Sequence, residues 1–360
     1  MRASQQRSEN VGYGQGQSSD ATISENIWFV VASGELGNVI MKIGFRYLVL
    51  VSIACFVACQ QQADPQVSDS QNENEVVDPT PQTPDAISLS GKPLYAPKPS
   101  EKLLNQLEER KRVFEANPND PDALIWYGRF VAYSGDYDAA IEIFTNGAKQ
   151  FPDDARMLRH AGHRFISIRK FDQAIEVLER ATELIKGKEN EIEPDGMPNA
   201  QDIPVSTLHG NIWYHLGLAY YLKHDFENAL RAYKNCLTTA GRPDNVVSAT
   251  HWIYMINRRL GHTEAANQAL DAIELEMDVI ENMGYHKCCC FYKGLMTLDA
   301  LEATIQEGLP REAIDYAIGN WHLYNGDPEK ARQRFELLTS HGAWNAFGFI
   351  AAESDLAAGP

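Results

Sequence analysis

The sequence lacks the marks of the common catalytic and nucleic-acid-binding classes. It contains no G-x-S-x-G, H-E-x-x-H or Walker-type phosphate loop. Basic residues are outnumbered, with 32 Lys and Arg against 49 Asp and Glu and a net charge of −17. Nucleic-acid binding depends on many basic contacts to phosphates, so this balance argues against nucleic acid as a partner. We therefore expect a non-enzymatic chain without catalytic residues that does not bind DNA or RNA.

Cysteine is also scarce, and no two cysteines form a C-x2-C pair, so neither a disulfide framework nor a conventional zinc site is indicated. Cys288, Cys289 and Cys290 stand together near His286. Adjacent helical residues point about 100° apart, which is unsuited to convergence on one metal. Buried packing is the favoured interpretation of this cluster, and metal or redox use is the alternative. We expect no cofactor and no bound metal.

A long hydrophobic run is missing as well. The apolar stretch from Tyr47 to Val57 is shorter than the roughly 20 residues that span a bilayer. Lys42 and Arg46 precede it, which is the pattern of a secretory signal peptide. The ending Phe56-Val57-Ala58-Cys59 resembles the lipobox of bacterial lipoproteins. That resemblance implies acylation of Cys59; an ordinary signal peptide or a short buried helix are the alternatives.

The N-terminal part therefore predicts three segments that are not part of a folded domain. Residues 1–40 are disordered or not translated, with the start at Met41, and residues 41–58 form the signal peptide. Residues 59–99 are rich in Gln, Asp, Asn, Pro and Ser, so they predict a disordered tether. Residue 60 is Gln rather than Asp, and the lipoprotein resemblance then implies an outer-membrane anchor facing the periplasm.

A repeating pattern organises the rest of the chain. It reads Leu124-x2-Tyr127-Gly128-x2-Val131, then Ala140-x3-Phe144, then Pro152. This is the spacing of two short helices joined by a turn, with small residues where the helices nearly touch. The pattern resembles the tetratricopeptide repeat family. The resemblance implies an all-α, right-handed solenoid of about five repeats with helical caps over residues 100–360.

The same spacing locates the later repeats. Gly162 lies 34 residues after Gly128, and Gly217 and Gly319 mark the third and fifth repeats. The fourth repeat is degenerate, and two inserts, 187–207 and 281–309, interrupt the array. The stretch from Glu101 to Ala116 predicts a half-repeat cap, and a helix near Ile350 predicts a second cap. Insert acids such as Glu189 to Glu193 are interpreted as solvated charge.

In the tetratricopeptide family the first helix of each repeat lines a concave groove. Transferred to this chain, the groove positions hold almost no acid, Asp122 excepted. The resemblance therefore implies a basic, tyrosine-lined groove suited to an acidic peptide segment or a C-terminal carboxylate. The alternative is that these positions are merely solvated. The candidate peptide-binding residues are Arg129, Tyr133, Arg156, Arg159, His163, Tyr214, Tyr221, His251 and Arg258.

These observations together predict a protein-binding scaffold or adaptor, a lipoprotein of the bacterial cell envelope. Its partners are other proteins or peptides, and its membrane contact is the lipid on Cys59. A soluble exported protein with the same groove is one alternative. An enzyme, or an enzyme subunit that uses the Cys/His-containing insert 281–309, is another.

Overall fold

The computed structural model describes residues 83–194 and 199–359. All of them belong to the second of the two units into which the chain divides, residues 79–360. The start at Met41, the signal peptide 41–58, Cys59 and most of the tether lie outside the described residues. Within the described ranges, no helix combines the length and the apolar character needed to cross a bilayer.

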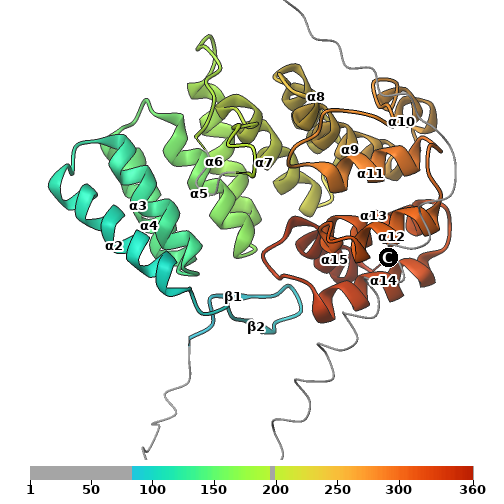
Figure 1. Cartoon of the computed structure of the whole chain (residues 1–360), viewed down its shortest axis with the longest axis horizontal. Helices are drawn as coiled ribbons and strands as arrows, with labels where there is room; N and C mark the ends of the chain where they lie inside the picture. The colour runs from blue at the N-terminus through green and yellow to red at the C-terminus, as the bar shows by residue number, and fades with distance from the viewer. Residues whose placement is uncertain (1–82, 195–198, 360) are drawn as a thin grey trace, which may run out of the picture. The chain divides into compact units, whose positions relative to one another are not determined.

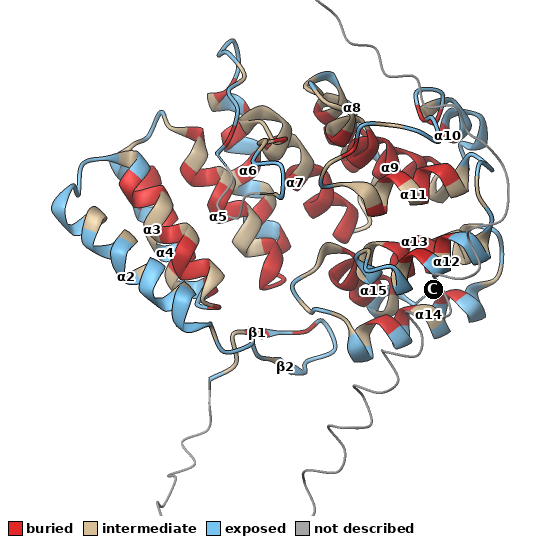
Figure 2. Cartoon of the chain, viewed as in Figure 1, coloured by how far each residue is buried: buried red, intermediate tan, exposed pale blue. Residues whose placement is uncertain are grey.

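Pairs of packed helices follow one another along the chain (Figure 1), as the repeat spacing predicts. The repeats are α3 Pro121–Tyr133 with α4 Tyr137–Gln150, α5 Ala155–Ser167 with α6 Phe171–Leu184, α7 Leu208–Leu222 with α8 Phe226–Thr238, α9 Pro243–Arg259 with α10 Thr263–Ala269, and α13 Arg311–Tyr324 with α14 Pro328–His341. Figure 2 shows buried residues concentrated on the faces where neighbouring helices meet.

Aspartates fix where many of these helices begin. The Asp120 and Asp154 carboxylates accept backbone N–H groups in the first turns of α3 and α5. Asp136, Asp225 and Asp327 do the same for α4, α8 and α14. A cap of this kind satisfies N–H groups that have no partner inside the helix and stabilises it by about 1 kcal/mol. Aspartates in the turns therefore mark the start of five of the ten repeat helices.

Glycine allows the two helices of a repeat to touch. A Cβ on Gly128 would lie 2.7 Å from the Phe144 ring, and one on Gly162 would lie 2.4 Å from Leu178 Cγ. Gly217 and Gly319 face Tyr233 and Phe335 in the same way. In each case the large residue follows its glycine by 16 positions. This regularity is the physical content of the sequence pattern.

The fourth repeat departs from this arrangement. Tyr254 occupies its glycine position, and the second helix, α10, has only 7 residues. The insert that follows contains α11 Met283–Tyr292 and α12 Leu298–Gln306. Helix α11 packs against α9 and α13, and Tyr292 stacks on Tyr254 with ring centroids 4.3 Å apart. The insert thus supplies packing that the short α10 cannot.

Two elements cap the array. Helix α2, Glu101–Ala116, packs on α3 and has no buried residue, and its Phe114 stacks on Tyr127. Helix α15, Phe347–Ala358, packs against α13 and α14 and also reaches α7. In contrast to α2, most of α15 is buried, including Glu353 and Asp355.

The folded region begins earlier than the expected boundary at residue 100. Strands β1 Ala86–Ile87 and β2 Pro93–Leu94 form an antiparallel hairpin. The Asp85 carboxylate accepts the Ala96 N–H at 2.7 Å, and the Trp344 indole donates to the Tyr95 carbonyl at 2.8 Å. Residues 83–99, which composition assigns to the disordered tether, are therefore ordered by contacts with the C-terminal part of the chain.

Candidate protein-binding surface

The insert that follows α6 crosses the first helices of repeats one to three. Its Glu193 side chain is only 7% exposed and lies between α5 and α7. Arg159 Nε approaches its Oε2 at 3.1 Å, and His160 Nε2 approaches its Oε1 at 3.3 Å. The Asn211 amide donates to Oε2 at 2.6 Å. Sequence reasoning interpreted this acid as solvated; that was wrong, because Glu193 is a buried carboxylate with a basic binding site.

Arg129 extends the same surface. Its guanidinium donates to the Pro194 carbonyl at 2.8 Å and stacks over Trp126, 4.6 Å from the ring centroid. Its Nε also donates to the Tyr133 hydroxyl at 3.3 Å. Of the nine predicted groove residues, Arg129, Tyr133 and Arg159 thus lie along the path of residues 193 and 194. We call Arg129, Arg159, His160 and Asn211 the carboxylate site.

Burial makes the carboxylate site sensitive to its charge balance. Desolvation lowers the pKa of Arg159, although the charge of Glu193 raises it in part. Desolvation also lowers the pKa of His160 well below its ordinary value, and the charges of Arg159 and Arg129 add to the effect. His160 is therefore neutral at pH 7, and Arg159 supplies the positive charge opposite Glu193. A buried arginine without a carboxylate would be costly, so this site requires an acid.

Two more acids, both on α15, neutralise bases from other helices. The Glu353 carboxylate accepts from Arg169 Nε at 2.8 Å. Asp355 accepts from Arg259 at 2.8 Å and from the Tyr316 hydroxyl at 2.9 Å. Burial alone would raise the pKa of Asp355, but bonds from His224 and Arg259 outweigh it and hold the pKa low. No spacing in the sequence indicates these pairs.

A small cavity of about 280 Å³ remains beside the carboxylate site. His163 and Tyr214 line it, together with Arg159 and Phe347. The Phe347 ring packs against His163 and His215, whose own rings are 4.5 Å apart. Tyr214 accepts from the Trp252 indole at 2.9 Å. This cavity brings His163, Tyr214 and Arg159 of the predicted set together.

Three predicted groove residues lie apart from this cavity. Tyr221 and His251 are each 1% exposed and belong to the core. Tyr221 shares a hydrogen bond of 2.5 Å with Tyr316, and His251 stacks on Tyr285. Arg258 stacks over Tyr324 and donates to Asn325 at 2.8 Å, at the far end of α9. None of the three lines the cavity beside Arg159.

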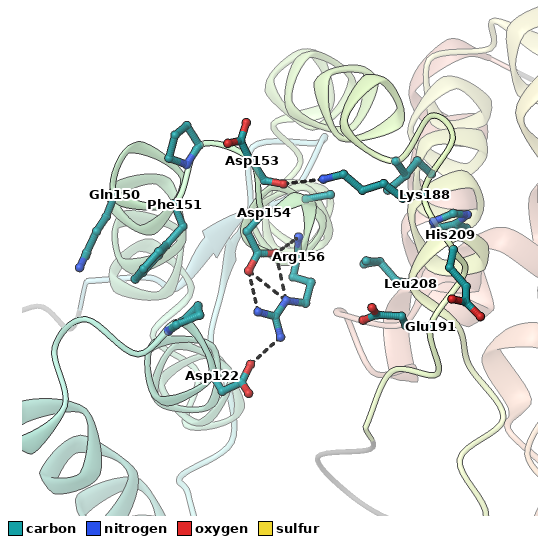
Figure 3. A pocket seen from close by; sticks show the side chains of 15 residues that line it. Asp122, Gln150, Phe151, Asp153, Asp154, Arg156, Lys188, Glu191, Leu208 and His209 are labelled. Atoms are coloured by element: carbon teal, nitrogen blue, oxygen red, sulfur yellow. Dashed lines mark hydrogen bonds and ion pairs between the residues drawn. The ribbon is translucent and has the colours of Figure 1, made fainter.

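Arg156 lies in a larger cleft of about 860 Å³ between the ends of α3 and α5 and residues 188–191 (Figure 3). Its guanidinium contacts Asp122 at 2.5 Å and Asp154 at 2.6 Å. The pKa of Arg156 is raised, and its hydrogen bond to Asp154 is the largest cause. Across the cleft, Lys188 donates to the Asp153 carbonyl at 2.8 Å. Arg156 is thus already paired with two acids.

The cysteine cluster on α11 is buried. Cys288, Cys289 and Cys290 are each 0% exposed, and burial raises the pKa of all three thiols. Cys290 Sγ lies 3.4 Å from His286 Nε2. Among the described residues, no group of three or more His, Cys, Asp or Glu side chains is placed to hold a metal ion. Buried protonated thiols are poor nucleophiles, so packing accounts for these residues.

Known proteins match the chain in its repeats. Two family models, each described as Tetratricopeptide repeat, match residues 131–186 and 210–241. The fold is therefore an all-α solenoid of tetratricopeptide repeats, as the sequence predicts. Tetratricopeptide repeats support a protein-interaction role for the chain.

Several solved structures are similar over part of the chain. One is "Crystal structure of YrrB: a TPR protein with an unusual peptide-binding site", which is 14% identical in sequence. The match covers 65% of this chain and 92% of that chain, with a TM-score of 0.37. Another is "MamA 41-end from Desulfovibrio magneticus RS-1", which is 20% identical. That match covers 47% of this chain and 82% of the other chain, with a TM-score of 0.36. No curated protein matches the sequence. These similarities are too low to transfer a binding property to this chain.

Proposed function

We propose that this chain is a non-enzymatic scaffold that binds an acidic segment of a partner protein on the first helices of repeats one to three. The observation that carries the proposal is Glu193, a buried carboxylate that Arg159, His160 and Asn211 surround. This contact supports the proposal, because the surface holds the carboxylate of the chain's own Glu193 away from water. Arg129 adds a charged donor beside it.

The charge of the whole chain makes such binding selective. With a net charge of −17, the protein repels acidic segments except where bases gather. An acidic partner is therefore directed to the carboxylate site and discouraged elsewhere. A charge-assisted hydrogen bond contributes about 1.5–3 kcal/mol, which corresponds to roughly 10- to 100-fold in affinity.

Arg129→Glu tests this function with little risk to the fold, because Arg129 is only half-buried and lies at the edge of the site. The control is Arg180→Glu, an identical charge change at an exposed position on α6. We expect Arg129→Glu to weaken capture of a fluorescein-labelled Glu-Ser repeat peptide about tenfold or more. Arg180→Glu should bind as the unchanged protein does. Equal binding by both variants would contradict the proposed function.

We further propose that the chain is exported and anchored in the cell envelope, at the periplasmic side of the outer membrane, through acyl chains on Cys59. The support is the sequence Phe56-Val57-Ala58-Cys59 after a short apolar run, with Gln60 following it. Cys59→Ala should move the protein from the membrane fraction to the soluble fraction. Mass spectrometry of the unprocessed chain should find Met41 as the first residue; a peptide from residues 10–30 would contradict that start.

A further inference from the structure

Residues 191–194 occupy the carboxylate site as a peptide ligand would. Resting on the function proposed above, we infer that they are a resident ligand, and that the partner binds by exchanging an extended, glutamate-containing segment for them. Three features of the segment lead to this inference: its backbone pairing, the burial of one side chain only, and the incomplete satisfaction of its charged group.

The backbone of residues 191–193 is held by the backbone of residues 206–208. The Leu208 N–H donates to the Glu191 carbonyl at 2.9 Å, and the Glu193 N–H donates to the Ser206 carbonyl at 3.0 Å. Ile192 pairs with Thr207 in an antiparallel bridge. Main-chain bonds of this kind do not depend on side chains, so any extended segment can make them. Residues 206–208 thus offer a partner strand the same donor and acceptor.

A single side chain of the segment enters the site. Glu193 is buried, whereas Ile192 is 64% exposed and Glu191 is exposed as well. An isoleucine left in water contributes nothing to holding the segment. The segment is therefore held by the Glu193 carboxylate, the strand pairing and the Arg129 bond to the Pro194 carbonyl. A glutamate on another chain can make each of these contacts.

The resident segment does not satisfy the site completely. Arg159 Nε and Glu193 Oε1 lie within ion-pair distance of partners, yet among the described residues neither forms a hydrogen bond. Buried charged groups in this condition retain part of their desolvation cost. A partner segment that is free to adjust can align its carboxylate better. The partner segment must still compete with residues 191–194, which are tethered beside the site. The resident segment therefore lowers the apparent affinity for every partner and raises the selectivity for partners that bind well.

The exchange can be tested by fluorescence anisotropy with a peptide of the chain's own sequence, fluorescein-Asn-Glu-Ile-Glu-Pro-Asp-amide. In Glu193→Gln the resident carboxylate is lost, so the peptide should bind about tenfold or more tightly than it binds the unchanged protein. The matched control is Glu191→Gln, at an exposed position two residues away, which should leave the affinity unchanged. The peptide should also raise the melting temperature of Glu193→Gln more than that of the unchanged protein.

The outcomes separate the exchange from the function on which it rests. If the unchanged protein and Glu193→Gln bind the peptide equally, while Arg129→Glu loses binding, the acidic-segment function stands and the exchange is overturned. If none of these proteins binds the peptide, including Glu193→Gln, the proposed function fails with it. Should Glu193→Gln not fold, hydrogen exchange decides on the unchanged protein. Saturating peptide should then expose the Glu193 amide while Leu208 stays protected, and unchanged protection of Glu193 would overturn the exchange.

Discussion

Five carboxylates are buried among the described residues, and each one is compensated by neighbouring donors: Glu193, Asp244, Asp315, Glu353 and Asp355. Asp244 is the example without a basic partner. It accepts the backbone N–H groups of Ile280, Glu281 and Asn282 and so fixes the start of the second insert. Apart from Asp315, which pairs with Arg334 of its own repeat, these buried acids mark the places where distant segments are attached to the repeats.

His251 predicts a measurable dependence of stability on pH. Burial lowers its pKa to about 3, whereas an unfolded histidine titrates near 6.5. Below about pH 6.5 the unfolded chain binds a proton that the folded chain excludes. The free energy of unfolding therefore decreases as the pH is lowered, and the loss reaches roughly 2 kcal/mol at pH 5. His251→Phe should make the urea-unfolding free energy less dependent on pH between 7 and 5. Parallel pH profiles for the two proteins would refute this assignment.

Two helical glycines predict opposite responses to the same substitution. Gly162→Ala places a Cβ 2.4 Å from Leu178 Cγ, so we expect a loss of about 1–3 kcal/mol. At Gly284, in α11, the nearest atoms to an added Cβ are 3.8 and 4.0 Å away. Alanine favours a helix over glycine, so Gly284→Ala should stabilise by about 0.5–1 kcal/mol. Urea unfolding of both variants measures the difference, and equal effects would contradict the close approach at Gly162.

At the scale of the element, α15 is held by ion pairs as well as by apolar packing. The Arg169 and Glu353 side chains are 3% and 8% exposed. Arg169 also donates to the Trp344 carbonyl at 2.7 Å, which fixes the approach to the helix. Its φ of 65° lies in the left-handed region, an uncommon conformation for arginine. A strained turn thus directs a guanidinium from repeat two toward the C-terminal helix.

Breaking this pair should cost more than replacing it. Glu353→Ala leaves Arg169 buried without its carboxylate, and we expect a loss of about 3–5 kcal/mol. The double variant Arg169→Met with Glu353→Leu removes both charges and should be closer to the unchanged protein than Glu353→Ala is. Chemical denaturation of the variants provides the comparison. A double variant less stable than Glu353→Ala would argue that Arg169 acts through its other hydrogen bonds.

At the scale of the folded unit, contacts of the C-terminal segment with repeats one and three set this array apart from an open solenoid. Repeat arrays ordinarily contact only their neighbours. Here Trp344 packs edge-on against Tyr137 with ring centroids 5.5 Å apart, and Ser354 donates to the Leu222 carbonyl at 2.6 Å. The C-terminal segment therefore couples repeats that are far apart in the sequence.

Removing residues 343–360 should uncouple the repeats. The unchanged folded unit should unfold in urea as one transition, because α15 joins repeats two and three to repeat five. The truncated chain should show a lower m-value and separate transitions, since smaller cooperative units expose less surface. Removal of Gly359 and Pro360 alone is the control and should change neither. A single transition of undiminished slope in the long truncation would exclude the coupling.

The sequence revealed the repeats because their signals are local. Gly217 and Tyr233, 16 residues apart, define their repeat without reference to the rest of the chain. The partner of Arg169 is 184 positions away, and no spacing rule links it to Glu353. Glu193 was missed for the same reason, since the path of an insert depends on what it packs against. The repeat spacing thus located the candidate groove residues in the sequence. Only the structure shows that residues 193 and 194 of the insert cover some of them.

Gly348 sets an expectation for the descendants and relatives of this chain. A Cβ there would lie 2.1 Å from the Glu312 backbone carbonyl, and a backbone atom cannot move aside as a flexible side chain can. Any lineage that keeps α15 against α13 should therefore keep this glycine. In a lineage that replaces this glycine, α15 no longer packs in this place, so Glu353 and Asp355 lose their partners and need not be conserved. The three positions should therefore be retained or lost together.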